Sequence, residues 1–242
     1  MTAASQAPEL LLQHHLKKLR LPTVLRDYEK LARQCAAENV DHVRYLARLI
    51  ELELIDRDAD ALADLVESLK PDAALHASTL DLADWPAVQH FADDLACRNR
   101  CVDVLVNNAG MSYVEPTPGI SAERIQKIFQ LNVHTPIASM HHVMEHMLAR
   151  GAGTIVNIAS NIAFQPTPFF THYAATKGAL ANFSEALRME LKGTGLHVLT
   201  VYPGPVKTPM GDHNWDLVGS PLLKWLTPYG NTTTLGRLVV KA

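Results

Sequence analysis

The chain has 242 residues, 48% of them hydrophobic, and a formal net charge of -3. A chain of this size and composition can bury one substantial core, and its charge argues against a globally basic protein that binds nucleic acid. Three cysteines form no C-x-x-C pair, and no apolar run is long enough to cross a bilayer. The sequence therefore predicts a reduced, cytoplasmic protein with no membrane-spanning segment.

Residues 7 to 56 show helical patterns throughout, with a break at Pro22 and a candidate N-cap at Asp41, and no strand is expected there. The basic residues of this segment alternate with acidic ones, so a solvated helix face is favoured over a DNA-binding surface. The basic residues are Lys17, Lys18, Arg20 and Arg26.

From residue 57 onward, helical and strand patterns alternate. Helices are expected at residues 57–69, 86–99, 121–149, 172–192 and 231–241, and strands at 74–79, 103–106, 154–159 and 196–202. This alternation predicts an α/β fold with a doubly wound parallel sheet and right-handed crossovers. A loop at residues 211–226 is the expected substrate loop. On the long helix, His142 and His146 have the spacing of a metal-binding pair, but without a completing carboxylate pattern no metal site is expected.

The strand at 154–159 delivers Ser160 to the carboxyl end of the sheet, where open α/β sheets place their ligands. Tyr173 begins the next helix, and Lys177 follows it at i+4, so the phenol and the ammonium share one helix face. A nearby cation favours the phenolate, so Lys177 is expected to lower the pKa of Tyr173. Ser160 can donate a hydrogen bond to an oxygen on which charge develops. The three residues together suit a carbonyl/alcohol redox step.

All twelve glycines lie at or after Gly110, so residues 1 to 109 contain none. A Rossmann-type phosphate turn needs glycines so that backbone N–H groups can approach a pyrophosphate, and a Walker-type loop needs them equally. Neither loop can form in the first 109 residues.

Several ordered motifs resemble the short-chain dehydrogenase/reductase family from about residue 57 to the C-terminus: Asn107-Asn108-Ala109-Gly110, Asn132 in QLNV, Ser160, Tyr173-Ala-Ala-Thr-Lys177 and Pro203-Gly204. The resemblance implies an NAD(P)-dependent oxidoreductase that binds NAD or NADP and acts on a small carbonyl or alcohol.

The roles that the resemblance implies are specific to each residue. Tyr173 would be the acid/base, Ser160 would orient the substrate, and Lys177 would lower the tyrosine pKa and hold the nicotinamide ribose. Asn132 would anchor a water in the proton relay. The other expected cofactor contacts are Asp81, Asn107, Ala109 and Gly110 on the adenine side and Pro203, Gly204 and Thr208 on the nicotinamide side. The resemblance also implies a homodimer through helices 121–149 and 172–192.

Residues 1–56 resemble instead the N-terminal helical segment of IstB-like transposition helper ATPases, in the runs LLQHHLKKLRLPT and HVRYLARLIELEL. The sequence thus predicts two parts: a helical segment at 1–56 and, at 57–242, an incomplete Rossmann-like domain that lacks the glycine turn. Two alternatives stay open, a DNA-transposition accessory protein and a fusion product without function. Because the first two strands of the fold are expected to be missing, the strand at 74–79 is predicted to pair directly with 103–106 in a sheet of about four strands.

Overall fold

The structure of the chain is a computed structural model that describes residues 51–69, 74–97, 102–206, 208, 210 and 230–241. The helices predicted before residue 51 and the loop at 211–226 lie outside the described residues. Helices and strands alternate along the described chain as the sequence predicted. They are β1 (Glu51–Asp56), α4 (Ala59–Leu69), β2 (Ala74–Thr79), α5 (Trp85–Cys97), β3 (Val104–Asn107), α6 (Ala122–Phe129), α7 (Thr135–Arg150), β4 (Gly153–Ile158), α8 (Thr171–Glu190), β5 (Leu196–Val201) and α11 (Thr232–Lys241).

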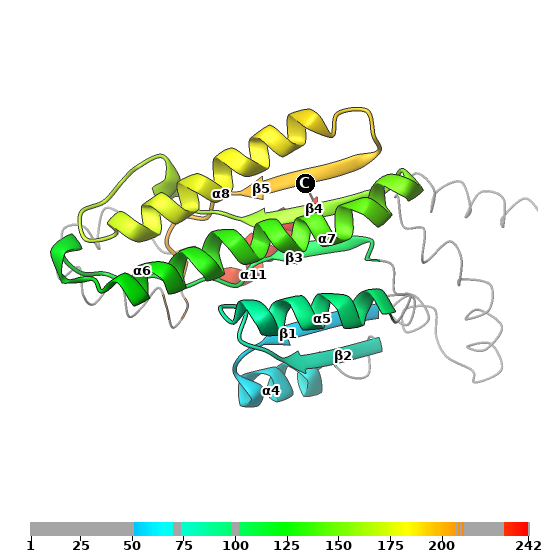
Figure 1. Cartoon of the computed structure of the whole chain (residues 1–242), viewed down its shortest axis with the longest axis horizontal. Helices are drawn as coiled ribbons and strands as arrows, with labels where there is room; N and C mark the ends of the chain where they lie inside the picture. Colours follow the sequence, from blue (N-terminus) through cyan, green and yellow to red (C-terminus); the bar gives the residue numbers. More distant parts are fainter. Residues whose placement is uncertain are drawn as a thin grey trace, which may run out of the picture.

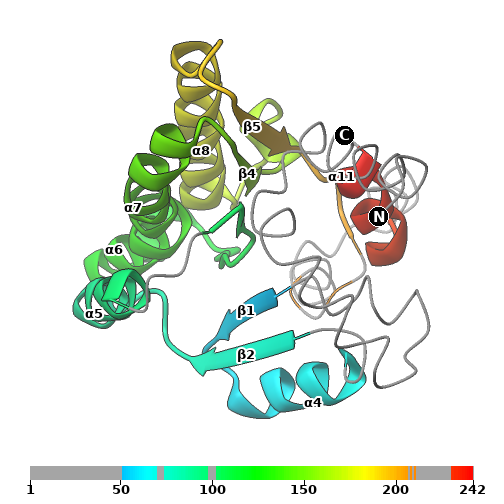
Figure 2. The ribbon, with the colours of Figure 1, turned by 90° about the vertical axis from the view of Figure 1, so that its right-hand side faces the viewer.

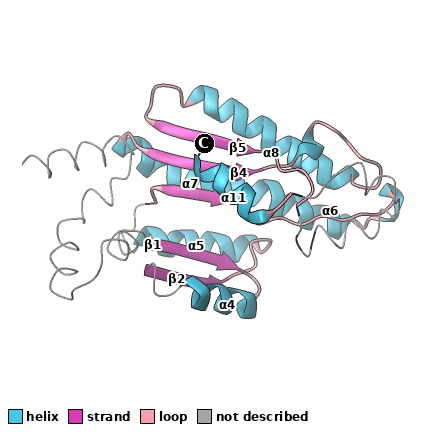
Figure 3. Ribbon diagram, turned by 180° about the vertical axis from the view of Figure 1, so that it is seen from behind, coloured by secondary structure: helices cyan, strands magenta, loops and turns pink. Residues whose placement is uncertain are grey.

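The strands form two parallel sheets within the described chain, β1-β2 and β3-β4-β5. Their arrows all point the same way, so their carboxyl ends lie toward one side of the molecule (Figure 3). Helices α5, α7 and α8 lie on one side of the strands, and α4 and α11 lie on the other (Figures 1 and 2). This is an α/β structure of the Rossmann-like type, with helices on both faces of parallel strands.

Strand β1 corrects the expectation that residues 41–56 are helical throughout. Glu51 to Asp56 pair residue by residue with Ala74 to Thr79. Glu51 and Glu53 alternate with Leu52 and Leu54, and this period of two is typical of a strand. The helical pattern upstream runs into this alternation, so its end could not be seen from periodicity alone.

The predicted pairing of the strand at 74–79 with 103–106 is wrong, as is the single sheet of about four strands. β2 pairs with β1 instead, while β3 pairs only with β4 among the described strands. The reason is local: β1, α4 and β2 form a compact parallel β-α-β unit, so β2 already has a partner close to it in the sequence. The described residues thus contain two halves. We call them the β1-β2 half and, after the residues that the sequence predicts to be catalytic, the catalytic half (β3, β4 and β5 with α6, α7 and α8).

The hydrophobic core belongs to the catalytic half. It lies between the three-stranded sheet and helices α7 and α8, and its most deeply buried side chains are Met140, Met147, Ile155 and Leu180. Helix α7 ends at Gly151, whose φ of 66° is the left-handed conformation that glycine adopts most easily. The chain can therefore turn at once into β4, whose C-terminal end leads to Ser160.

The predicted long helix at 121–149 is a continuous helical rod with one irregularity. Its first part, α6, starts at Ser121, whose side chain accepts a hydrogen bond from the Arg124 N–H. A π-helical turn, η3 (Gln130–His134), then joins α6 to α7. Such turns occur frequently at functional sites, and this one contains Asn132.

Candidate active site

Ser160, Tyr173 and Lys177 converge at the carboxyl end of the catalytic half. Ser160 directly follows β4, where its backbone is fixed by hydrogen bonds on either side, from Ala159 N–H to the Val201 carbonyl (2.8 Å) and from Asn161 N–H to the Pro203 carbonyl (3.0 Å). The Tyr173 phenol and the Ser160 hydroxyl are hydrogen-bonded to each other. The strand and the helix thus bring together two groups that lie thirteen positions apart in the chain.

The Lys177 side chain is almost completely buried, with 4% of its surface exposed. Its ammonium donates a hydrogen bond to the Ile158 carbonyl at 2.7 Å and lies 5.8 Å from the centre of the Tyr173 ring. Burial lowers the pKa of Lys177 to about 8. The ammonium is therefore still the main form at neutral pH, but it loses its proton far more easily than an exposed lysine.

The pKa of Tyr173 moves in the direction opposite to the one expected from the sequence. Burial raises it above the ordinary tyrosine value, and the hydrogen bond with Ser160 offsets only part of that rise. The sequence argument considered the charge of Lys177 but not the loss of water around the phenol, which penalises the phenolate. In this structure Tyr173 is therefore a protonated phenol at neutral pH, and it holds its proton more tightly than an exposed tyrosine does.

Asn132 lies behind these residues, fully buried in the π-helical turn. Its side chain accepts a hydrogen bond from the Met111 N–H (2.9 Å) and donates to the Met111 carbonyl (2.9 Å) and to Thr176 Oγ1 (3.0 Å). Thr176 in turn donates to the Tyr173 carbonyl at 2.8 Å. Asn132 therefore links the segment after β3 to the first turns of α8.

The segment Asn107 to Gly110 leaves the end of β3 beside Lys177. Asn107 donates a hydrogen bond to Asn157 Oδ1 at 2.8 Å, while Asn108 and Ala109 are exposed. At Gly110, a Cβ would lie 3.3 Å from Asn132 Oδ1 and 3.5 Å from Lys177 Nζ. The absence of a side chain there lets the Asn132 and Lys177 side chains pack closely against the backbone.

The other predicted cofactor contacts follow β5 and β2, which belong to different sheets. Pro203 and Gly204 follow β5 and face Asn161, since a Cβ on Gly204 would lie 3.7 Å from Asn161 Nδ2. Thr208 donates a hydrogen bond to the Val206 carbonyl at 3.4 Å. Asp81 follows β2, accepts a hydrogen bond from the Ala83 N–H and lies 3.7 Å from Lys127 of α6. Of these residues, Asp81 belongs to the β1-β2 half.

Two further candidates, Asp56 and Arg57, were missed because residues 41–56 were expected to be helical. They stand at the carboxyl end of β1, where Asp56 accepts a hydrogen bond from the Asp58 N–H (2.9 Å) and its side chain is exposed. An acidic residue about 20 positions after the glycine turn of a Rossmann fold hydrogen-bonds the adenine ribose, and a nearby arginine accommodates a 2'-phosphate. The signal in the sequence was the Glu-Leu alternation that ends in Asp-Arg.

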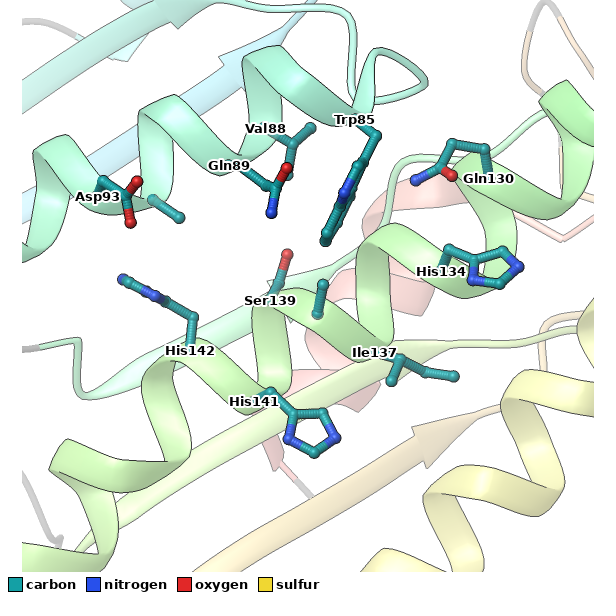
Figure 4. A pocket seen from close by; sticks show the side chains of 12 residues that line it. Trp85, Val88, Gln89, Asp93, Gln130, His134, Ile137, Ser139, His141 and His142 are labelled. Carbon is teal, nitrogen blue, oxygen red and sulfur yellow. The ribbon is translucent and has the colours of Figure 1, made fainter.

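A groove of about 730 Å³ lies away from this site, between α5 and α7 (Figure 4). Trp85 presents the face of its indole ring to it, and Asp93 and His142 face each other across its far end. None of the residues predicted to hold substrate or cofactor lines this groove. The residues that the sequence predicts to be catalytic therefore gather around Tyr173 and not along this groove.

A family model described as short chain dehydrogenase matches residues 42–217. D-threitol dehydrogenase of Mycolicibacterium smegmatis is 30% identical over 187 residues, which are 77% of this chain and 72% of that protein. L-xylulose reductase of Mus musculus is 32% identical over 162 residues, 66% of this chain and 64% of that protein, so the chain spans less than two thirds of the mouse enzyme.

Among solved structures, a short-chain dehydrogenase from Sphingobium yanoikuyae in complex with NADPH has a TM-score of 0.69 at 26% identity, covering 79% of this chain and 74% of that one. The chain belongs to the short-chain dehydrogenase family. The match begins at residue 42, ahead of the residue 57 expected from the sequence, and so includes β1. The division into two parts at residue 56 and the IstB-like resemblance remain predictions. In the described part of the chain, no helix is long and apolar enough to span a membrane.

Proposed function

We propose that the chain is an NAD(P)-dependent oxidoreductase that interconverts a carbonyl compound and its alcohol. The observation that carries this proposal is the convergence of three side chains: the Ser160 hydroxyl interacts with the Tyr173 phenol, and the buried Lys177 ammonium lies 5.8 Å from the centre of the Tyr173 ring. This arrangement places a proton donor, a second hydrogen-bond donor for the same substrate oxygen and a cation within one small region. Relatives that the chain matches are named as dehydrogenases and reductases of polyols and sugars, which supports the reaction class.

The residues present fit one half of a nicotinamide dinucleotide. The nicotinamide ribose would lie near Gly110 and Lys177, with Lys177 as donor to its hydroxyls. Pro203, Gly204 and Thr208 would border the nicotinamide ring. When bound, the nicotinamide exchanges hydride with the substrate carbon. Asp56 and Arg57 would contact the adenine ribose at the other end.

The residues do not fit the pyrophosphate between these two ends. A pyrophosphate is usually held by backbone N–H groups of a glycine turn at a helix N-terminus, and the sequence contains no glycine before Gly110. Binding of the whole dinucleotide should therefore be weak, with a dissociation constant of about 0.1 to 1 mM or more. The reaction itself would depend on the nicotinamide end of the cofactor.

Within the catalytic half, each residue has a distinct task. The Ser160 hydroxyl would donate a hydrogen bond to the substrate oxygen and hold it against the Tyr173 phenol. Burial raises the pKa of Tyr173, so the phenol keeps its proton at neutral pH and would give it to that oxygen only as negative charge develops there during reduction of a carbonyl. Asn132 would keep the first turns of α8 in place.

A titration of the full chain with NADH and with NADPH tests this proposal. Binding is followed by calorimetry, which does not depend on turnover. We expect weak but saturable binding of at least one cofactor, abolished by replacing Lys177 with methionine. No heat of binding at millimolar cofactor would contradict the proposal, since the nicotinamide half alone should support some affinity.

We also propose a homodimer through α7 and α8, the helices expected to pair from the sequence. Leu148 of α7 and Met189 of α8 have 44% and 64% of their surface exposed, and an interface that covered these apolar side chains would gain free energy from their burial. Light scattering during gel filtration measures the mass directly. We expect a dimer that dissociates when Leu148 and Met189 are both changed to glutamate, and a monomer in the native chain would contradict this proposal.

A further inference from the structure

A single buried amide, that of Asn157, connects four elements of the catalytic half. No part of its side chain is exposed. Its Oδ1 accepts a hydrogen bond from Asn107 of β3 at 2.8 Å, and its Nδ2 donates to Ser184 Oγ of α8 at 2.9 Å. The same nitrogen lies 3.2 Å from the sulfur of Met140 on α7. Asn157 itself is on β4, so the amide touches both neighbouring layers.

The donor and acceptor directions of the hydrogen bonds in this network require an amide at position 157. Ser184 donates its only hydroxyl proton to the Leu180 carbonyl at 2.6 Å, so toward Asn157 it can only accept. Asn107 approaches from the other side as a donor. The residue between them must accept on one side and donate on the other, which an amide does and a carboxylate or an apolar group does not.

Asn157 stands next to the residue that holds Lys177. Ile158, the following residue on β4, accepts the hydrogen bond from the Lys177 ammonium at 2.7 Å. Lys177 and Ser184 are seven residues apart on α8, and residues at this spacing lie on the same helix face. Two adjacent residues of β4 therefore hold positions about two turns apart on the same face of α8.

We propose that Asn157 is a positioning residue: by joining β4 to α8 and β3, it holds the Lys177 ammonium at the Ile158 carbonyl, next to Tyr173. The kinetic consequence of this role rests on the proposed function, whereas its structural consequence does not. A role in folding alone would make Asn157 important for stability but would leave the surroundings of Lys177 unchanged in the folded protein.

The variant Asn157→Leu separates these two roles, since leucine has a similar size but can make neither hydrogen bond. In the full chain labelled with 15N-lysine, the Lys177 ammonium signal is identified by its loss in Lys177→Met. We expect Asn157→Leu to speed exchange of the Lys177 ammonium protons with water by about tenfold or more, because the bond to Ile158 is no longer held in place. We expect kcat to fall about 10- to 100-fold while KM changes by less than about threefold.

Val143→Ala is the matched control, because Val143 is a buried core residue of α7 that is not part of the hydrogen-bonded network. It should lower the melting temperature without changing the Lys177 signal or kcat. If Asn157→Leu does not fold, Ser184→Ala removes only the bond to α8 and should speed the same exchange to a smaller degree. An unchanged Lys177 signal in the folded variant would overturn the proposal. If the native chain shows no turnover, the proposed function fails, and the exchange measurement still decides the role of Asn157.

Discussion

The two halves of the molecule differ in the number of paired strands and in the hydrophobic core beneath them. In the catalytic half, three strands are paired in register, a common core lies beneath them, and Ser160, Tyr173 and Lys177 meet at the carboxyl end. In the β1-β2 half, two strands with α4 present Asp56 and Arg57 at the same end, and they share no strand pairing with the other sheet among the described residues. Under the proposed function, the proton chemistry and the binding of the adenine ribose would therefore belong to separate parts of this fold.

The largest expected effect concerns the catalytic half. Changing Tyr173 to phenylalanine removes the only proposed proton donor, so the reduction rate should fall about 10² to 10⁴-fold. The rate is measured by the oxidation of NADPH with a small aldehyde in excess. Tyr113→Phe is the matched control and should leave the rate nearly unchanged, because the Tyr113 hydroxyl contacts only the sulfur of Met111 among its described hydrogen bonds. Equal rates for the two variants would place the chemistry elsewhere.

Ser160→Ala should have the next largest effect in the same half. It removes one hydrogen-bond donor to the substrate oxygen, a loss of about 10²-fold in kcat. It also removes the hydrogen bond that offsets part of the rise in the Tyr173 pKa, so that pKa should rise further. An ultraviolet titration of tyrosinate in the variant and the native chain measures this change. A Tyr173 pKa that falls in Ser160→Ala would contradict the geometry described above.

A third prediction concerns stability as a function of pH. Lys177 has a pKa of about 8 in the folded chain and 10.5 in the reference state. Between these values the unfolded chain binds more protons than the folded one, so stability should rise with pH, by up to about 2 kcal/mol between pH 8 and about 9.5. Above about pH 10 the raised pKa of Tyr173 acts in the opposite sense. Urea unfolding at several pH values measures the slope, and Lys177→Met should lack this rise.

The smallest expected effect concerns the β1-β2 half and tests whether this half contacts the adenine ribose of the cofactor. If Arg57 contacts a 2'-phosphate, Arg57→Ala should weaken NADPH binding by about tenfold and leave NADH binding nearly unchanged. Asp56→Ala should instead weaken NADH, because its carboxylate fits the ribose hydroxyls. Calorimetric titrations of both variants with both cofactors test this. Equal losses for the two cofactors in both variants would show that this half does not contact the adenine ribose.

Much of the catalytic half could be predicted from the sequence because its determinants are local. Ser160, Tyr173 and Lys177 lie on a strand and a helix that follow one another, and their spacing fixes which faces meet. The start of β1 could not be predicted, since the Glu-Leu alternation of residues 51–54 follows an apolar pattern of helical spacing in the sequence without a glycine or a proline between them. The pairing of β2 was wrong for the same reason, because its partner had been assigned to a helix.

The direction of the Tyr173 pKa could not be predicted from spacing either. A lysine at i+4 is visible in the sequence, but the burial of both side chains depends on residues from β3, β4 and the π-helical turn that cover them. The role of Asn157 could not be predicted either. A single asparagine in a strand forms no recognisable sequence motif, and its partners Asn107 and Ser184 come beside it only in the folded chain.

The central claim is that this chain retains the residues that act at the nicotinamide end of the cofactor but binds the pyrophosphate weakly. The most direct test compares kcat/KM for NADH with that for reduced nicotinamide mononucleotide, which lacks the adenosine and the second phosphate. Since little binding should come from the pyrophosphate, we predict that the two values differ by no more than about tenfold, and that both activities are lost in Tyr173→Phe. A preference for NADH of about 10³-fold or more would show that the whole dinucleotide is gripped and would contradict the account.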